Sequence, residues 1–338
     1  MPPDLRVLGL GHCLPPQIVS NEELAAALGE PAADIAARTG IAERHRAADG
    51  EGPSDLALRA ARDALAAART TVDELGLIVF ATATPDVTFP GAACYLQEKL
   101  GAPTVGALDV RAQTAGFLCA LDLASSFAAV PAPRGGRDAR YARMLIAAGE
   151  VHAGGLDATP RGRDMTPRFG DGAAAAVVGQ ADSGPRLVAV RWTTEGELAD
   201  RFWCEYPASY QTPVRITAAD IAAGKHFPRG DLAALAPIAR DRLGAAAREV
   251  LDAAGWRPSD VDLLVIDYVD PAVAGDAGEA LGVARERTVV PTREFGHVMA
   301  GGIAIALARR LVALHAGARA LLVAAGPGFT YGAAALEA

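Results

Sequence analysis

The sequence predicts an α/β fold built from two similar halves stacked in layers, because one series of elements occurs twice in the same order. Each series has a helical segment, a buried strand, a long helix that opens with small residues, and a further strand. In the first half these segments are 56–68, 77–81, 115–127 and 143–148, and in the second half they are 240–254, 263–266, 300–307 and 318–325. One such match would mean little, but several in the same order imply a duplicated unit.

Local patterns of apolar residues justify the individual elements. Residues 56–68 repeat apolar side chains at helical spacing, whereas 77–81 and 263–266 are uninterrupted apolar runs of the length of a buried strand. Each half then reaches a Gly-rich turn, at 169–173 and 326–330, where small residues let backbones cross closely or adopt a positive φ.

Stacking the two halves would give an αβαβα arrangement with the two long helices at its centre. Those helices begin near Thr114 and Met299. We therefore expect their N-termini to meet at the junction of the halves, where pockets preferentially form. The turn-like composition near residues 181–185 places the expected boundary there, which gives halves of residues 1–183 and 184–338.

The composition of the 338-residue chain excludes several classes of function. Its formal net charge of −8 argues against a nucleic-acid partner, because binding phosphate backbones needs a basic surface. No apolar stretch reaches the roughly 18 residues that span a bilayer, and the first residues lack the pattern of a signal peptide. We expect a cytoplasmic protein without a membrane partner. The cysteines lack metal-type spacing, so we expect reduced core residues and no metal site at Cys13, Cys94, Cys119 and Cys204.

The segment 109–117 is the predicted centre of the first half. An apolar strand end breaks there at small polar residues and runs into a helix, which places Thr114 at the helix N-terminus. The first-turn N–H groups and the helix dipole favour negative charge at that position. A strand, turn and helix in this order are a common way to present a nucleophile.

Four short motifs stand in a fixed order along the chain. They are Arg38-Thr39-Gly40-Ile41 with Glu43-Arg44-His45, Asp109-Val110 with Ala115-Gly116-Phe117, Phe169-Gly170-Asp171-Gly172, and Gly328-Phe329-Thr330 with Gly332-Ala333. In this order they resemble β-ketoacyl-ACP synthase III, a family with the thiolase fold, over essentially the whole chain. The resemblance implies that fold and a homodimer.

The catalytic positions implied by this resemblance carry different residues here. Condensing enzymes of the family use a cysteine, a histidine and an asparagine, and the corresponding positions are Thr114, Asp267 and His297. A threonine hydroxyl needs a neighbouring base, and His297 is the candidate. Asp267 would fix the tautomer of the imidazole if it meets the other ring nitrogen.

The residues at positions 267 and 297 favour acyl transfer over carbon–carbon bond formation. In the condensing enzymes the neutral His and Asn side chains stabilise an enolate, which a carboxylate at position 267 would oppose. The pair Asp267 and His297 therefore indicates acyl transfer to a hydroxyl or amine, and it resembles an acyltransferase branch of the family. Thr114 could form an acyl ester or only line the pocket. We expect direct attack by the acceptor, because a threonine ester is a poorer acyl donor than a thioester.

The resemblance also places the oxyanion donor and the acyl donor. In the family, the middle residue of the terminal Gly-rich turn donates its backbone N–H to the oxyanion hole. Here that turn is Gly326-Pro327-Gly328, and its middle residue, a proline, has no N–H. Losing one such donor typically costs about 3 kcal/mol of transition-state stabilisation. Arg38 and Arg163 match arginines that contact the nucleotide of CoA. Asp34 replaces the adenine-stacking tryptophan, so both CoA and an acyl carrier protein stay open as donors.

The leading hypothesis is an acyltransferase of secondary metabolism, such as polyketide synthesis, that uses a CoA or phosphopantetheine thioester and a small-molecule acceptor. No cofactor is expected beyond the carrier group of the donor. The alternatives are a non-standard β-ketoacyl synthase, a thioester hydrolase, and a non-catalytic partner of an active ketosynthase. The aromatic segment 202–206 is expected to roof the acceptor pocket, and Thr88-Phe89-Pro90 to influence acyl length near the dimer edge. We expect His152, His226 and His315 to be surface or capping residues.

Overall fold

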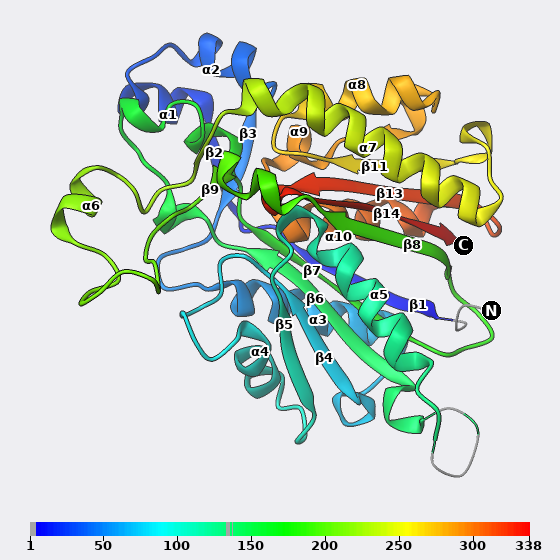
Figure 1. Ribbon diagram of the computed structural model, residues 1–338. Helices are drawn as coiled ribbons and strands as arrows, with labels where there is room; N and C mark the ends of the chain where they lie inside the picture. The colour runs from blue at the N-terminus through cyan, green and yellow to red at the C-terminus, as the bar shows by residue number, and fades with distance from the viewer. Residues whose placement is uncertain (1–4, 133–135, 137) are drawn as a thin grey trace.

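The computed structural model describes residues 5–132, 136 and 138–338 and has a mixed α/β architecture (Figure 1). Ten strands form one sheet in the order β12-β11-β13-β14-β8-β1-β7-β6-β4-β5. Their bounds are β1 (Arg6–Cys13), β4 (Leu77–Ala81), β5 (Gly106–Val110), β6 (Arg143–Glu150), β7 (Gly172–Gly179), β8 (Arg186–Thr194), β11 (Leu263–Asp267), β12 (Thr288–Val289), β13 (Arg319–Gly326) and β14 (Thr330–Glu337). Two small sheets pair β2 (Gln17–Ser20) with β3 (Glu43–Arg46) and β9 (Phe202–Trp203) with β10 (Arg229–Gly230).

The two ends of the large sheet repeat one another. Counted along the chain, each half places its strands in the order third, second, fourth, fifth, first, as β5-β4-β6-β7-β1 and as β12-β11-β13-β14-β8. In both halves the second strand pairs in parallel with the third and fourth, and the fifth pairs antiparallel with the fourth. The duplicated α/β halves expected from the sequence are thereby confirmed. A boundary between residues 183 and 184, which would fall between β7 and β8, stays a prediction.

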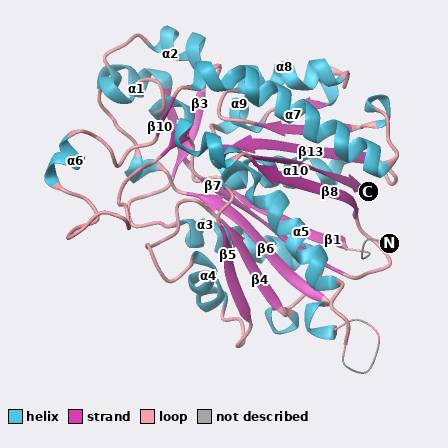
Figure 2. Cartoon of the chain, viewed as in Figure 1, coloured by secondary structure: helices cyan, strands magenta, loops and turns pink. Residues whose placement is uncertain are grey.

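Helices cover both faces of each half, as Figure 2 shows. The helices are α1 (Asn21–Leu28), α2 (Ala32–Thr39), α3 (Pro53–Ala68), α4 (Ala92–Leu100), α5 (Gly116–Ala128), α6 (Ala218–Ala222), α7 (Leu232–Ala254), α8 (Pro271–Leu281), α9 (Pro291–Phe295) and α10 (Met299–Arg310). One apolar cluster joins α5 and α10 to the inner faces of both halves. Two others join α3 and α4 to the outer face of the first half, and α7 and α8 to that of the second. This is the expected five-layer arrangement.

The small residues that open the central helices permit their close approach. A Cβ atom at Gly116 would lie 3.0 Å from the Cβ atoms of both Ala300 and Ala81. Glycine and alanine at these positions let α5 lie directly against α10 and β4. The N-termini of the two central helices are therefore brought together, as their matching sequences predict.

Glycine is also required where α3 crosses β1. A Cβ atom at Gly9 would lie 2.3 Å from the carbonyl oxygen of Ala64 and 2.5 Å from the backbone nitrogen of Ala68. We expect Gly9→Ala to lower the free energy of unfolding by about 1–3 kcal/mol, because the helix must move away from the sheet. Gly196→Ala is the matched control, since no atom lies within 4 Å of its added Cβ. Equal melting temperatures for the two variants would contradict this prediction.

Two expectations about local structure need correction. The helix expected at 240–254 begins eight residues earlier, at Leu232, because the Asp231 side chain accepts a hydrogen bond from the Ala234 N–H and caps it. All four cysteines are free, but only Cys119 is buried, while Cys13 is half-buried and Cys94 and Cys204 are exposed. The expectation that all four are core residues was therefore wrong. No helix in the described part of the chain is long and apolar enough to cross a membrane.

Candidate active site

Thr114 lies at the start of the central helix α5, in the place expected from the sequence. The chain leaves β5 at Val110, forms a short 3-10 turn over Gln113–Ala115 and continues into α5 at Gly116. Gln113 has a φ of 45°, in a region that non-glycine residues rarely adopt. The Thr114 side chain is fully buried. A Cβ atom at Gly326 would lie 2.3 Å from Thr114 Oγ1, so glycine at the end of β13 leaves the space that the hydroxyl occupies.

His297 comes from the second half and meets Thr114 at the junction of the halves. It follows Gly296, which ends α9 with a φ of 80°. The backbone N–H of His297 donates to the carbonyl oxygen of Arg168 at 2.7 Å, and its ring lies 5.9 Å from the Phe169 ring between centroids. Its side chain is fully buried. The two halves therefore hold the imidazole at a fixed position.

Four fully buried side chains form one hydrogen-bonded chain. Thr114 Oγ1 lies 3.2 Å from His297 Nε2, and His297 Nδ1 lies 3.0 Å from Thr292 Oγ1. Thr292 Oγ1 in turn donates to Asp267 Oδ1 at 2.6 Å. Because the single hydroxyl hydrogen of Thr292 goes to the carboxylate, its oxygen accepts from His297 Nδ1–H. The lone pair of Nε2 then faces the Thr114 hydroxyl, which is the arrangement that activates a hydroxyl group.

Asp267 acts on His297 through Thr292. The direct distance from Asp267 Oδ1 to His297 Nδ1 is 3.7 Å, beyond the range of a normal hydrogen bond. The structure thus brings together Thr114, Asp267 and His297, but the expected direct contact between carboxylate and imidazole is replaced by a bridge. Sequence reasoning missed Thr292, because a single threonine near the start of a short helix forms no pattern that singles it out.

We expect Thr292→Val to reduce the activity that depends on His297 by about 10- to 100-fold, the size typical of groups that orient a reacting side chain. Valine has the shape of threonine but leaves Asp267 Oδ1 and His297 Nδ1 without the bridging hydroxyl. Thr292→Ser keeps that hydroxyl and is the matched control. Steady-state rates of the two variants check the prediction, and equal losses in both would show that the shape of the side chain matters more than its hydroxyl.

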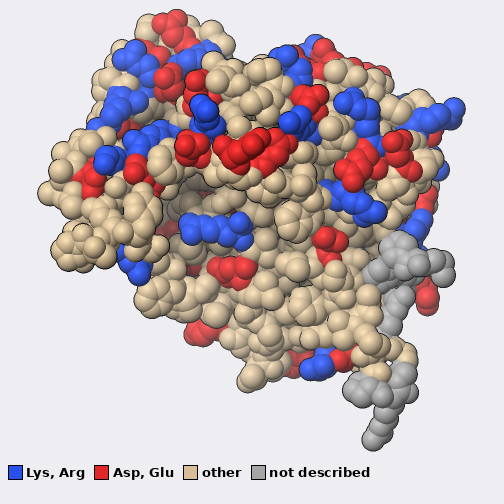
Figure 3. Space-filling view, in the orientation of Figure 1, with Lys and Arg blue, Asp and Glu red and all other residues tan. Residues whose placement is uncertain are grey.

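A cavity of about 730 Å³ lies beside this chain of hydrogen bonds. It opens on the face seen in Figure 3, where a hollow separates the segment around α6 from the rest of the molecule. Gln113, Met299 and Gly328 line it, and each is a close neighbour in sequence of Thr114, His297 or Gly326. Thr114 and His297 themselves are fully buried and are not among the residues that line the cavity, so their neighbours form the wall between the cavity and the hydrogen-bonded chain.

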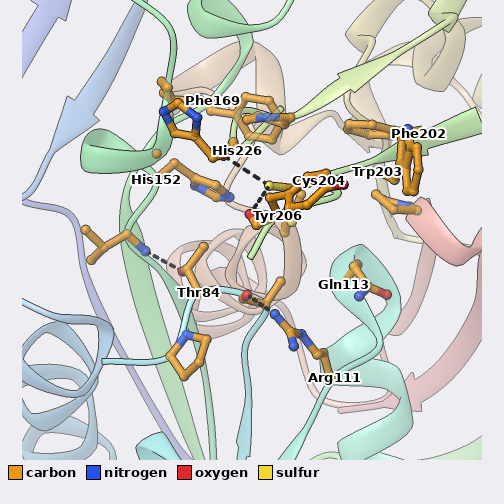
Figure 4. A pocket seen from close by; sticks show the side chains of 18 of the residues that line it. Thr84, Arg111, Gln113, His152, Phe169, Phe202, Trp203, Cys204, Tyr206 and His226 are labelled. Atoms are coloured by element: carbon orange, nitrogen blue, oxygen red, sulfur yellow. Dashed lines mark hydrogen bonds between the residues drawn. The ribbon is translucent and has the colours of Figure 1, made fainter. Parts of the chain in front are cut away.

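Six aromatic or imidazole side chains form part of the rest of the cavity wall (Figure 4). They are Phe169, Phe202, Trp203, Tyr206, His152 and His226. Arg111 is the only charged residue among the described lining residues, and it donates to the carbonyl oxygen of Ala83 at 3.1 Å. A mostly apolar site with few polar groups is typical of small-molecule binding.

A buried carboxyl group holds one wall of the cavity. Glu150, at the end of β6, accepts hydrogen bonds from the hydroxyl groups of Thr82 and Thr84 and from the N–H groups of Ala83 and Thr84. Desolvation by complete burial raises the pKa of Glu150 to about 7, although these donors oppose the shift. Glu150 thereby fixes the segment that carries the cavity residues Ala83 and Thr84.

The fold and this geometry agree with comparisons to known proteins. A family model for 3-oxoacyl-[acyl-carrier-protein] synthase III matches residues 108–196, and one for the C-terminal part of the same family matches residues 251–338. The chain is 36% identical over 332 residues to β-ketoacyl-[acyl-carrier-protein] synthase III 3 of Streptomyces coelicolor, which covers 97% of this chain and 95% of the relative. The chain belongs to the 3-oxoacyl-[acyl-carrier-protein] synthase III family.

Solved structures of ketosynthase III enzymes have the same thiolase fold. The chain is similar to the 3-oxoacyl-[acyl-carrier-protein] synthase III of Aquifex aeolicus VF5, with a TM-score of 0.86, 29% identity and coverage of 99% of this chain and 100% of the other. It is also similar to the priming β-ketosynthase of the R1128 polyketide biosynthetic pathway, with a TM-score of 0.85, 27% identity and coverage of 100% and 97%. The chain is thus an enzyme of a family that transfers acyl groups.

The terminal turn carries a proline at the position where the sequence predicts a missing oxyanion donor. Gly326 ends β13, and Pro327–Phe329 form a short turn before β14. Pro327 and Gly328 line the cavity beside Thr114. Since the proline nitrogen carries no hydrogen, it cannot stabilise an oxyanion at this position. The loss of an oxyanion donor that the resemblance implies stays a prediction, at a residue that lines the cavity.

The two arginines expected to bind the donor lie away from the hydrogen-bonded chain. Arg38, on α2, pairs with Glu30 at 2.5 Å and with Asp164 at 3.4 Å, and it donates to the carbonyl oxygen of Arg163 at 2.7 Å. Arg163 donates to the carbonyl oxygen of Pro160 at 3.0 Å. Neither is among the residues that line the cavity. Their role in binding a ketosynthase III donor stays a prediction, and the positive charge of Arg38 is offset by its two acidic partners.

Several other cavity residues were predicted with mixed success. Phe202, Trp203, Cys204 and Tyr206 line the cavity, where the sequence placed a lid, and Thr88 lines it as well. Phe89 is 77% exposed, and its role in acyl length stays a prediction. The expectation for His152 was wrong, because this residue is buried in the cavity wall, whereas His315 is exposed as expected. His226 is half-buried and also lines the cavity. The sequence around His152 resembles a loop, and whether a loop is buried depends on what the rest of the fold places over it.

Proposed function

We propose that this ketosynthase III enzyme moves an acyl group from a CoA or carrier-protein thioester to a hydroxyl or amine acceptor. The observation that carries the proposal is the buried chain of hydrogen bonds from Thr114 through His297 and Thr292 to Asp267. It places a basic imidazole nitrogen 3.2 Å from a hydroxyl group at the N-terminus of a buried helix.

In the first step, Thr114 Oγ1 attacks the thioester carbonyl carbon while His297 Nε2 takes the hydroxyl proton. The carbon–sulfur bond then breaks, and the leaving thiolate receives that proton from the imidazolium. Asp267, through Thr292, stabilises the imidazolium that exists between these events. The product of the step is an acyl ester on Thr114 and a free thiol.

In the second step, the acceptor occupies the place that the thiol has left. Its hydroxyl or amine proton passes to His297 Nε2 as its oxygen or nitrogen attacks the ester carbonyl carbon. Thr114 Oγ1 leaves and takes the proton back, which restores the enzyme. Because Nε2 lies 3.2 Å from Thr114 Oγ1, we favour this covalent route over the direct attack by the acceptor that the sequence alone suggests.

The same groups are poorly suited to carbon–carbon bond formation. A condensing ketosynthase needs neutral hydrogen-bond donors around an enolate, whereas Asp267 brings a buried carboxylate to that side of the site. Pro327 does not discriminate between the two reactions, because acyl transfer also develops an oxyanion and lacks the same backbone donor. We place the enzyme in cytoplasmic secondary metabolism as a homodimer, on the basis of its resemblance to polyketide-type ketosynthases.

An acceptor-dependence experiment tests the proposed function. The purified chain is incubated with acetyl, butyryl and octanoyl thioesters of CoA and of an acyl carrier protein, with and without a panel of alcohols and amines. We expect thiol release that increases with acceptor and yields an ester or amide detectable by mass spectrometry. Thiol release that ignores the acceptor would indicate a hydrolase. Carbon dioxide release from a malonyl thioester would indicate condensation, and complete inactivity would favour the non-catalytic partner.

A further inference from the structure

His152 lines the cavity and carries a buried hydrogen-bond acceptor that no described residue uses. It lies two residues beyond the end of β6, and its backbone N–H donates to Asp171 Oδ1 at 2.7 Å. The residue is 6% exposed and lines the cavity, and Figure 4 shows its ring pointing inward. Its backbone is therefore fixed, and its ring belongs to the wall of the site.

The two ring nitrogens of His152 have different surroundings. Nδ1 lies 2.9 Å from the carbonyl oxygen of Gly170, which can only accept, so Nδ1 carries the hydrogen. Nε2 therefore has a lone pair, and it has no hydrogen-bond partner among the described residues. Burial lowers the pKa of His152 to about 3, with the nearby His297 as a smaller contribution, so the ring stays neutral at physiological pH.

His152 lies close to the reacting groups, with Phe169 next to both its ring and that of His297. Its ring lies 4.7 Å from the Phe169 ring, and Phe169 lies 5.9 Å from the His297 ring, all between centroids. A ligand in the cavity whose carbonyl group reaches Thr114 would pass this wall. A buried acceptor without a partner costs about 1–3 kcal/mol, which a ligand donor can recover by bonding to it.

The charges of the cavity limit the kind of donor that fits. The described lining residues include Arg111 but no aspartate or glutamate. An ammonium group would be desolvated there beside a positive charge and without a counter-ion, which is unfavourable. A hydroxyl group can donate to Nε2 without adding charge.

We propose that His152 Nε2 binds a hydroxyl group of the ligand, so that the enzyme selects a hydroxylated substrate. This inference rests on the proposed acyl transfer. The hydroxyl can belong to the acyl chain, as in a 3-hydroxyacyl thioester, or to an acceptor with a second hydroxyl besides the one acylated. A site built to bond a hydroxyl discriminates strongly against the analogue that lacks it, because its buried acceptor is then left unpaired.

Matched substrate pairs test the proposal. One arm compares 3-hydroxybutyryl-CoA with butyryl-CoA at a fixed acceptor, and the other compares 1,6-hexanediol with 1-hexanol at a fixed donor. In the wild type we expect kcat/KM to favour the hydroxylated member of one pair by about tenfold or more. His152→Leu should bring that ratio close to one, because the acceptor for the substrate hydroxyl is gone. His152→Gln, which keeps an acceptor oxygen, should restore part of the preference.

The outcomes separate this inference from the proposed function. Ratios near one in both arms of the wild type, or an unchanged ratio in His152→Leu, would overturn the role of His152 while leaving acyl transfer intact. If no transfer occurs, the dissociation constants of the two CoA thioesters and of the two alcohols, from isothermal titration calorimetry, report the preference without catalysis. Equal constants within both pairs would then refute it, and this comparison needs no variant to fold.

Discussion

In His297→Ala, acyl transfer should fall by on the order of 10³-fold, which corresponds to about 4 kcal/mol of transition-state stabilisation. The reason is that Nε2 is the base 3.2 Å from the Thr114 hydroxyl, and a threonine hydroxyl is too weakly acidic to react without one. Initial rates of thiol release with a saturating thioester and acceptor measure the effect.

His315→Ala is the matched control for this variant. His315 is an exposed histidine whose side chain is 71% accessible, so its loss should leave the rate unchanged. Circular dichroism spectra confirm that both variants are folded. A His297→Ala enzyme that keeps more than a tenth of the wild-type rate would show that another group takes the proton.

Thr114→Ala should abolish the acyl adduct and lower transfer by about 10³-fold, since removing the nucleophile of a covalent route costs as much as removing its base. Intact-protein mass spectrometry after mixing with a thioester, without acceptor, should show the mass of one acyl group on the wild type and none on the variant. Thr114→Ser retains the hydroxyl and should still form the adduct.

The two routes of transfer give different results in this experiment. If Thr114→Ala transfers at the wild-type rate while His297→Ala does not, the acceptor attacks the thioester directly and Thr114 only lines the site. An adduct that persists in Thr114→Ala would place the acyl group on a different side chain. Peptide mapping of the adduct then identifies that side chain.

Much of the fold and part of the site could be predicted from the sequence, for a physical reason. Each buried strand and central helix can be recognised from the spacing of apolar residues within its own segment. Because the same series of elements occurs twice, each half supports the assignment of the other. Thr114, Asp267 and His297 lie at ends of such elements, so a correct topology brings them together. The strand order of both halves and the contact of Thr114 with His297 follow from this placement.

The remaining parts of the site depend on contacts that leave no local pattern. Thr292 became significant only because the separation of Asp267 and His297 leaves room for one hydroxyl between them. His152 was expected at the surface, but it is buried against the segment that carries Phe169, Gly170 and Asp171. The extent of α7 was likewise underestimated, because Pro237 lies inside the helix, where a proline usually marks its start or end.

Pro327 has a consequence for any redesign of this enzyme. The triple variant T114C/D267H/H297N would carry the three side chains that the family resemblance implies for a condensing enzyme. The main chain at position 327 would still offer no hydrogen to an oxyanion. A condensing variant designed on this chain would therefore also need Pro327→Gly, which restores a backbone N–H at that position.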